Sequence, residues 1–199
     1  MFKENNILKN HRPSIDEVNE YIQKWNKLED YVNQEKALDK LFLTLCKDNN
    51  SIENILIKCS ALNDFYSTNI FKVHNVAQHY YTQDIDERLR VGDLSLIDDL
   101  ANIEINGKRF YFYSFATKYC SHHRPNVYPI YDSYVHKLLK YFRDRDHFCS
   151  FRDKDLKSYR TYANVILALQ KFYGLTSFTV KDIDKYLWLL GKEAFNRYK

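Results

Sequence analysis

The stretch that decides the fold is residues 115–132, FATKYCSHHRPNVYPIYD. It places Lys118 and Asp132 on either side of two prolines, Pro125 and Pro129. Proline lacks a backbone donor and restricts the residue before it, so a single helix cannot run from the lysine to the aspartate. We therefore expect Lys118 near the start of one helix and Asp132 at the start of the next, with both helix starts facing one cleft.

The composition predicts a mainly helical, all-α protein. The chain has 199 residues, and 45% of them are hydrophobic, which is enough apolar side chain for a proper core. It contains only 4 Gly and 3 Pro, too few turn-forming residues for the many hairpins of a β sandwich or barrel. The formal net charge of +4 permits a polyanionic partner such as nucleic acid without requiring one.

No metal, cofactor or membrane segment is expected. The four cysteines, Cys46, Cys59, Cys120 and Cys149, lie far apart and lack the CxxC or CxxH spacing of zinc and iron–sulfur sites, so we interpret them as free thiols in a reducing compartment. Residues 1–13 are too polar for the core of a signal peptide, and no apolar run approaches ~18 residues. We expect a cytoplasmic monomer.

Capping residues and hydrophobic periodicity predict a series of helices. Ser14 and Glu17 form a capping box, and the apolar stripe behind it continues to Val32. Ser51 is a second N-cap, and Thr179 caps the last helix. The helices after the first are expected over residues 37–45, 51–62, 70–80, 84–90, 93–100, 113–123, 131–142, 156–173 and 179–191, the last of them closed by Gly191.

Two segments are expected to be non-helical. Residues 103–110 alternate around Asn106-Gly107, which is the strongest two-residue hairpin signal, and predict a small β ribbon. Residues 143–153 are charged with aromatic residues between them, and we interpret them as a surface connection.

Three segments together resemble one known family. They are Thr117-Lys118, residues 129–136 (PIYDSYVH) and the polar loop over residues 63–70. These segments are similar to the catalytic lysine position, the aspartate segment and the DNA-probing loop of the helix-hairpin-helix (HhH-GPD) DNA glycosylase superfamily. The resemblance covers roughly residues 51–140 and suggests a divergent member.

The resemblance implies a two-lobed helical fold with a cleft between the lobes. Residues 51–125 would form one helical, barrel-like lobe, and residues 1–50 would pack with residues 126–199 to form the other. The sequence departs from the family at the hairpin, where a Gly-x-Gly turn normally holds a DNA phosphate, because residues 112–116 contain no glycine. The segment from lysine to aspartate is also shorter than in the family.

The resemblance further implies that a damaged or modified base is removed from double-stranded DNA, in repair or in defence against phage DNA. Asp132 would stabilise the positive charge that develops on the sugar, and Lys118, with a lowered pKa, would attack C1′ and form a Schiff base. The base must first be flipped out of the duplex. The DNA-contacting candidates are the loop residues Tyr66, Ser67, Thr68 and Asn69, the stacking candidates Phe65, Tyr66 and Tyr131, and the phosphate-contacting candidate Lys137.

Other interpretations stay open. Taken singly, Lys118 is typical of a solvated helix surface and Asp132 of a simple N-cap. A HEPN-type ribonuclease needs an Arg and a His with four to six residues between them, but only three residues separate Arg143 from His147, so the spacing fails by one. A non-enzymatic helical module that binds DNA or a protein would use the basic surface and give Lys118 and Asp132 no task.

Overall fold

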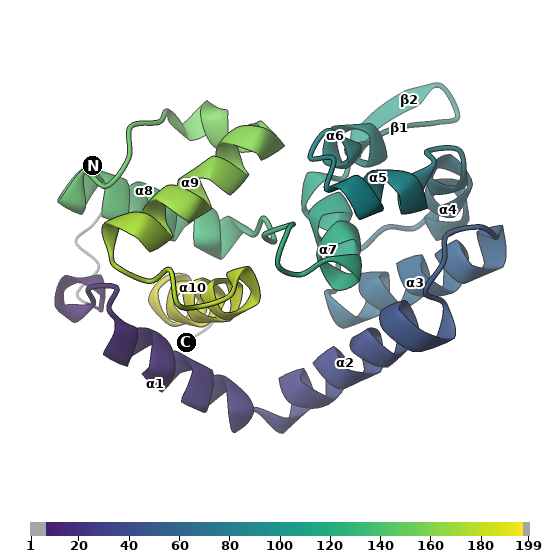
Figure 1. Ribbon diagram of the computed structural model, residues 1–199. Coiled ribbons are helices and arrows are strands. Elements are labelled where there is room, and N and C mark those ends of the chain that lie inside the picture. Colours follow the sequence, from purple (N-terminus) through teal and green to yellow (C-terminus); the bar gives the residue numbers. More distant parts are fainter. Residues whose placement is uncertain (1–6, 197–199) are drawn as a thin grey trace.

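The protein is mainly helical in the computed structural model, which describes residues 7–196 (Figure 1). This confirms the predicted all-α class with a small β ribbon. Of the polar N-terminal segment, residues 1–6 lie outside the described range. The elements are α1 (Ile15–Asn26), α2 (Glu29–Lys40) with a π-helical turn (Leu41–Leu45), α3 (Ile52–Phe65), α4 (Val73–Tyr81), α5 (Ile85–Val91), α6 (Leu96–Ala101), β1 (Asn102–Ile105), β2 (Lys108–Tyr111), α7 (Tyr113–His123), α8 (Ser133–Asp146), α9 (Tyr159–Phe172) and α10 (Val180–Phe195), with short 3-10 turns at Leu8–Asn10 and Asp153–Lys157.

The predicted N-caps and the predicted hairpin are confirmed, but the capping box predicted at Ser14 is only half formed, because the carboxylate of Glu17 contacts His11 and Tyr186 instead. The hydroxyls of Ser14, Ser51 and Thr179 each accept a hydrogen bond from the backbone N–H three residues later, which satisfies a donor in the first turn of α1, α3 and α10. β1 pairs antiparallel with β2. Asn106 and Gly107 between them both have positive φ, 52° and 72°, as a type I′ turn requires.

The helices gather in two groups (Figure 1). In one group α3 packs against α4 and α7, and α7 packs against α6; in the other, α10 packs against α1 and α8. α2 runs between the groups along one side, and the segment between α7 and α8 crosses from the first group to the second. One continuous set of buried apolar side chains extends through both groups. The later part of the crossing segment, residues 128–132, therefore runs through the interior, whereas Arg124 and Asn126 at its start are exposed.

The first helix ends earlier than predicted. α1 and α2 are separated at Leu28, whose backbone is non-helical, with φ −92° and ψ 83°. The bend allows Trp25 to stack on Tyr31, with 5.7 Å between the ring centroids. The apolar stripe predicted one helix as far as Val32, but the contact between these two rings favours a bend at Leu28 instead.

Other helix ends also differ from the prediction. α8 begins at Ser133 and continues to Asp146 instead of stopping at Phe142, so only the later part of residues 143–153 is a connection. His147 ends it in the left-handed conformation, with φ 53°. The charged residues of the last turn are compatible with a helix because they are paired, and the half-buried Arg145 and Asp146 form an ion pair at 2.5 Å.

Gly191 lies inside α10 and does not close it, because α10 continues to Phe195. A Cβ atom at Gly191 would lie 2.8 Å from Cβ of Tyr134 and 3.1 Å from its backbone carbon and oxygen. The glycine therefore serves the close approach of α10 to α8 and not the end of a helix.

Candidate functional site

Lys118 is a buried amine in the middle of α7. Its side chain is 5% exposed, and Nζ donates to Ser114 Oγ at 2.5 Å and to the Ser114 carbonyl oxygen at 3.4 Å. Nζ also lies 5.1 Å from the centre of the Tyr66 ring. The expectation that Lys118 would lie near a helix start is wrong, because the helix already begins at Tyr113.

Burial changes the protonation of this amine. It lowers the pKa of Lys118 to about 8, against the opposing charges of Asp132 and Asp184. Neither hydrogen bond of Nζ goes to a carboxylate. About one tenth of the amine is therefore unprotonated at pH 7, and an unprotonated amine is a nucleophile.

Side chains of three helices hold the crossing segment in place. The peptide groups of residues 129–131 need hydrogen-bond partners, because this part of the segment is largely buried and belongs to no helix or strand. Side chains of α7, α9 and α10 supply them: Tyr159 Oη donates to Pro129 O at 3.1 Å, Tyr162 Oη donates to Ile130 O at 2.5 Å, Ile130 N donates to Asp184 Oδ2 at 2.9 Å, Tyr131 N donates to Thr117 Oγ1 at 3.1 Å and Ser114 Oγ donates to Tyr131 O at 2.8 Å. The position of Asp132, the next residue, is thereby fixed.

Asp132 is the N-cap of α8. Its Oδ1 accepts a hydrogen bond from Tyr134 N at 2.7 Å, and its extended backbone directs the chain into the helix. The predicted place at a helix start is confirmed, and so is the capping role. A carboxylate has several acceptor positions, so the cap does not use up its capacity.

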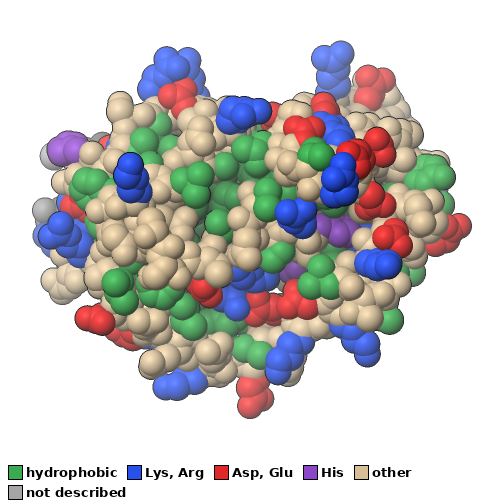
Figure 2. All heavy atoms as spheres, in the orientation of Figure 1, with side chains coloured by type: hydrophobic (Ala, Val, Ile, Leu, Met, Phe, Trp, Pro, Cys, Tyr) green, Lys and Arg blue, Asp and Glu red, His purple; other side chains and the backbone are tan. Residues whose placement is uncertain are grey.

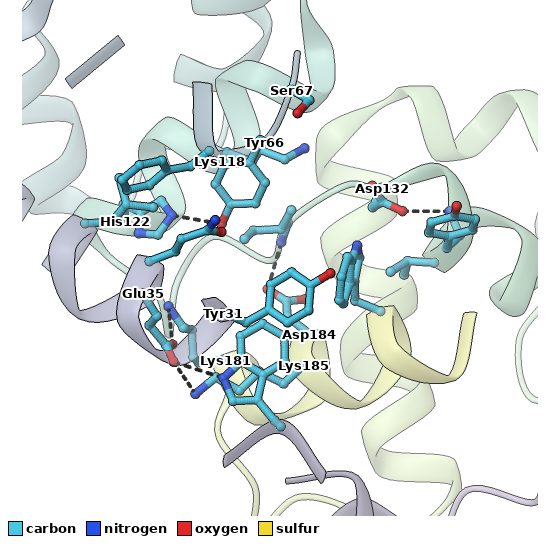
Figure 3. Close-up of a pocket in the computed structure, with 18 residues that line it drawn as sticks. Tyr31, Glu35, Tyr66, Ser67, Lys118, His122, Asp132, Lys181, Asp184 and Lys185 are labelled. Carbon is cyan, nitrogen blue, oxygen red and sulfur yellow. Dashed lines mark hydrogen bonds and ion pairs between the residues drawn. The ribbon is translucent and has the colours of Figure 1, made fainter. Parts of the chain in front are cut away.

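Two adjoining cavities meet at Lys118 and Asp132, and Figure 3 shows the residues that line the first of them. The first, which we call the aromatic cavity, has a volume of about 340 Å³, and the second, the outer cavity, about 410 Å³. Tyr66, Lys118 and Asp132 line both. The amine and the carboxylate that the sequence singled out therefore face a common space.

Rings from distant parts of the chain form the walls of the aromatic cavity. Trp25 and Tyr31 come from α1 and α2, and Trp188 from α10 lies edge-on to both, at 6.0 and 5.2 Å between centroids. Tyr66 closes the side next to Lys118. Flat apolar walls of this kind are suited to a planar, aromatic ligand.

His122 holds Tyr66 against the amine. The Tyr66 hydroxyl lies 3.0 Å from His122 Nε2. Burial, with the positive charge of Lys181 as a lesser cause, lowers the pKa of His122 to about 3. The imidazole is consequently neutral at pH 7, so Nε2 can accept the hydroxyl proton of Tyr66.

A charged trio lies at the edge of the aromatic cavity (Figure 3). Lys181 and Lys185, one turn apart on α10, pair with the two oxygens of Glu35 at 3.0 and 2.9 Å. Burial opposes ionisation of Glu35, but the two lysines outweigh it and hold the pKa of Glu35 below its usual value. The trio carries one net positive charge.

The loop after α3 is organised by one side chain. Asn63 Oδ1 accepts hydrogen bonds from Thr68 Oγ1 at 2.7 Å and Ile70 N at 2.9 Å, and its Nδ2 donates to Ile70 O at 3.2 Å. Directly after this loop, Phe71 is 97% exposed. Phe71 is thus the aromatic residue that projects here, whereas Tyr66 lines the cavities.

The predicted site residues are only partly brought together. Phe65 and Ser67 line the aromatic cavity, Thr68 and Tyr131 line the outer cavity, and Tyr66 lines both. Asn69 lines neither cavity and is exposed with a left-handed backbone, φ 56°. Lys137 also lies outside both cavities, with its amine 5.5 Å from the centre of the Phe195 ring.

Sequence reasoning missed the contribution of α10. Asp184 follows Ile183 and precedes Leu187 by three positions, which places a carboxyl group on the buried stripe of the helix. An acidic residue at such a position is a signal that could have been used, because carboxylates are rarely buried without a reason. Trp188, Lys181 and Lys185 lie on the same face of α10 and also line the aromatic cavity.

The surface around the cavities carries mixed charge. Figure 2 shows Lys and Arg side chains distributed among acidic ones around a hollow with hydrophobic side chains inside, and no broad basic patch on this face. Among residues 7–196, no group of three or more His, Cys, Asp or Glu side chains could hold a metal ion, and no helix is both long and apolar enough to cross a membrane.

The chain is similar to a protein family and to a bacterial protein. A family model named HI_0787_N, described as an N-terminal domain, matches residues 17–127, which is more than half of the chain. The chain belongs to the HI_0787_N family. A Haemophilus influenzae protein described as uncharacterized is 48% identical over 153 residues, which are 76% of this chain and 73% of that protein. No solved structure matches. The HI_0787_N match ends between α7 and α8, so Lys118 lies inside it and Asp132 outside.

Proposed function

We propose that this protein is a DNA glycosylase that cleaves the N-glycosidic bond of a flipped-out damaged or modified base. The observation that carries the proposal is the buried, partly unprotonated amine of Lys118, which shares two cavities with the carboxylate of Asp132. A nucleophile and an anion at one aromatic-walled space are the groups that this reaction needs. The resemblance of residues 51–140 to the HhH-GPD superfamily supports the same reaction.

In the proposed reaction Nζ of Lys118 bonds to C1′ of the sugar while the bond from C1′ to the base breaks. The base leaves with the bonding electron pair and takes up a proton. Positive charge builds up on the sugar as the bond breaks, and Asp132 stabilises it. Loss of a proton from the nitrogen and opening of the sugar ring then leave an imine between Lys118 and the sugar, from which strand cleavage follows.

The partner would be double-stranded DNA with its target base in the aromatic cavity. The volume of that cavity lies in the range of small-molecule sites, and its rings can stack on a flat base. Phe71 is the exposed ring at the loop, and would fill the gap that the flipped base leaves. The β1–β2 hairpin, which directly precedes residues 112–116, carries the exposed Lys108 and Arg109, and these side chains would contact phosphate. A cytoplasmic location fits this substrate and the four free thiols.

The test is borohydride trapping on DNA duplexes that carry a panel of damaged or modified bases. Borohydride reduces an imine to a stable amine, so a covalent protein–DNA adduct is expected with the wild-type protein and none with Lys118→Gln. If Lys118→Gln still releases the base without cutting the strand, water is the nucleophile and Lys118 has another role. Absence of base release from every duplex, with DNA binding retained, would leave a DNA-binding module instead of an enzyme.

Asp132→Asn separates the chemical role of Asp132 from its cap. Asparagine caps a helix as well as aspartate, so Tm and DNA binding should be unchanged while base release falls at least about 100-fold. The matched control is Asp30→Asn, which alters an exposed aspartate in the first turn of α2, outside both cavities. Full activity of Asp132→Asn would remove Asp132 from the mechanism.

A further inference from the structure

Asp184 is the most unusual polar group in the aromatic cavity. It is 6% exposed and lines the cavity from α10. Oδ2 accepts the hydrogen bond from Ile130 N, but Oδ1 is buried and has no hydrogen-bond partner among the described residues. A buried polar atom without a partner costs free energy, so its retention points to a partner that arrives with a ligand.

The nearby cations do not neutralise this carboxyl group. Lys181, one turn before it, pairs with Glu35, and the amine of Lys118 donates to Ser114. Burial raises the pKa of Asp184 to about 8, although the Ile130 amide and both lysines oppose the rise. Asp184 is therefore mostly a neutral acid at pH 7. Because Oδ2 is the acceptor for an N–H, the acid proton resides on Oδ1.

We propose that Asp184 selects the ligand of the aromatic cavity by donating a hydrogen bond from Oδ1 to a carbonyl oxygen on the edge of a planar ring. Trp25, Tyr31 and Trp188 supply the flat walls against which such a ring lies, and Asp184 lines the same cavity (Figure 3). The inference rests on the proposed function, and it specifies the substrate class: bases that carry an oxo group are bound in preference to bases that lack one.

A matched pair of free bases tests this selection without any chemical step. Hypoxanthine and purine share one ring system and differ in the carbonyl group. The two tryptophans of the chain, Trp25 and Trp188, both line the cavity, so their fluorescence reports its occupancy directly. We expect the wild-type protein to bind hypoxanthine at least about fivefold more tightly than purine, the size of effect that one hydrogen bond gives.

Two variants at the same position complete the experiment. Asp184→Asn can still accept from Ile130 N and presents an amide donor in place of the acid, so it should retain the preference for hypoxanthine. Asp184→Ala should lose the preference while it still binds purine, and Glu53→Ala, which removes an exposed carboxylate on α3, should behave as wild type. Binding of purine by Asp184→Ala verifies that the variant is folded.

The possible outcomes separate this inference from the proposed function. Equal affinity for the two bases in the wild-type protein, no binding of either base, or an unchanged preference in Asp184→Ala overturns the role of Asp184, whatever the trapping assay shows. A preference that depends on Asp184, together with no adduct on any DNA duplex, supports the role of Asp184 and overturns the glycosylase.

Discussion

At the scale of single residues, burial and not the helix dipole lowers the pKa of Lys118. The amine belongs to the second turn of α7, so the positive end of the helix does not account for its lowered pKa. The surrounding protein removes water from the ammonium group, which favours the neutral form. Asp132 and Asp184 act in the opposite direction, and the pKa of about 8 is the balance of these effects.

This balance predicts how adduct formation depends on pH. With DNA that carries an abasic site, the initial rate of borohydride trapping should rise about tenfold per pH unit below pH 8, since only the neutral amine attacks, and should level off above it. Initial rates between pH 6 and pH 10 measure this. A rate that is flat over this range, or one that rises only near the pKa of a free lysine, would show that burial does not control the amine.

At the scale of elements, the close contact between α8 and α10 depends on the absence of a side chain at Gly191. Gly191→Ala would place Cβ against Cβ and the backbone of Tyr134, and the backbone cannot move aside like a flexible side chain. We expect a net destabilisation of roughly 1–2 kcal/mol, because the clash exceeds the gain in helix propensity.

Thermal unfolding measures this, and Tm should fall by about 2–8 °C. Leu167→Ala, at an exposed position of α9, serves as the control and should change Tm little. A higher Tm for Gly191→Ala would mean that helix propensity outweighs the close contact between the two helices.

Local signals predicted the elements well, and contacts between distant residues explain the exceptions. The caps at Ser14 and Ser51 and the Asn106-Gly107 turn depend on neighbours in sequence, and these features are present in the structure. The bend at Leu28 depends on the contact between Trp25 and Tyr31, which no hydrophobic period encodes.

The same distinction applies to the candidate site. Lys118 and Asp132 could be identified because the prolines between them imply two helices that meet. Asp184 and Trp188 could not, because their place in the cavity depends on how α10 packs beside the crossing segment. The position of the amine within α7 was also wrong, although the helix was predicted over residues 113–123, because Lys118 is the sixth residue of a helix that begins at Tyr113.

At the scale of the whole molecule, the cavities draw on nearly the full length of the described chain. Residues from α1 to α10 line the aromatic cavity, so both helix groups must be in place before it exists. Burial of the acid Asp184 in this shared interior therefore couples its protonation to the stability of the complete fold.

The sign of this coupling can be predicted. The pKa of Asp184 is raised in the folded state, so the folded protein binds more protons than the unfolded chain between about pH 4 and pH 8, and stability falls as pH rises through this window. Asp184→Asn has no proton to lose. Its Tm relative to the wild type should therefore increase between pH 5 and pH 8, on the order of 5 °C, and change no further above pH 8. Thermal unfolding at several pH values decides this, and a constant difference in Tm would show that Asp184 is ionised in the folded protein.

The clamp that Asn63 forms around the loop after α3 has a consequence for affinity. Its three hydrogen bonds fix the segment before any partner arrives. A segment that is already ordered has little conformational freedom left to lose on association, so more of its contact energy remains as binding strength. Phe71 thus follows a loop that is already ordered. A surface that binds Phe71 does not have to order this loop first.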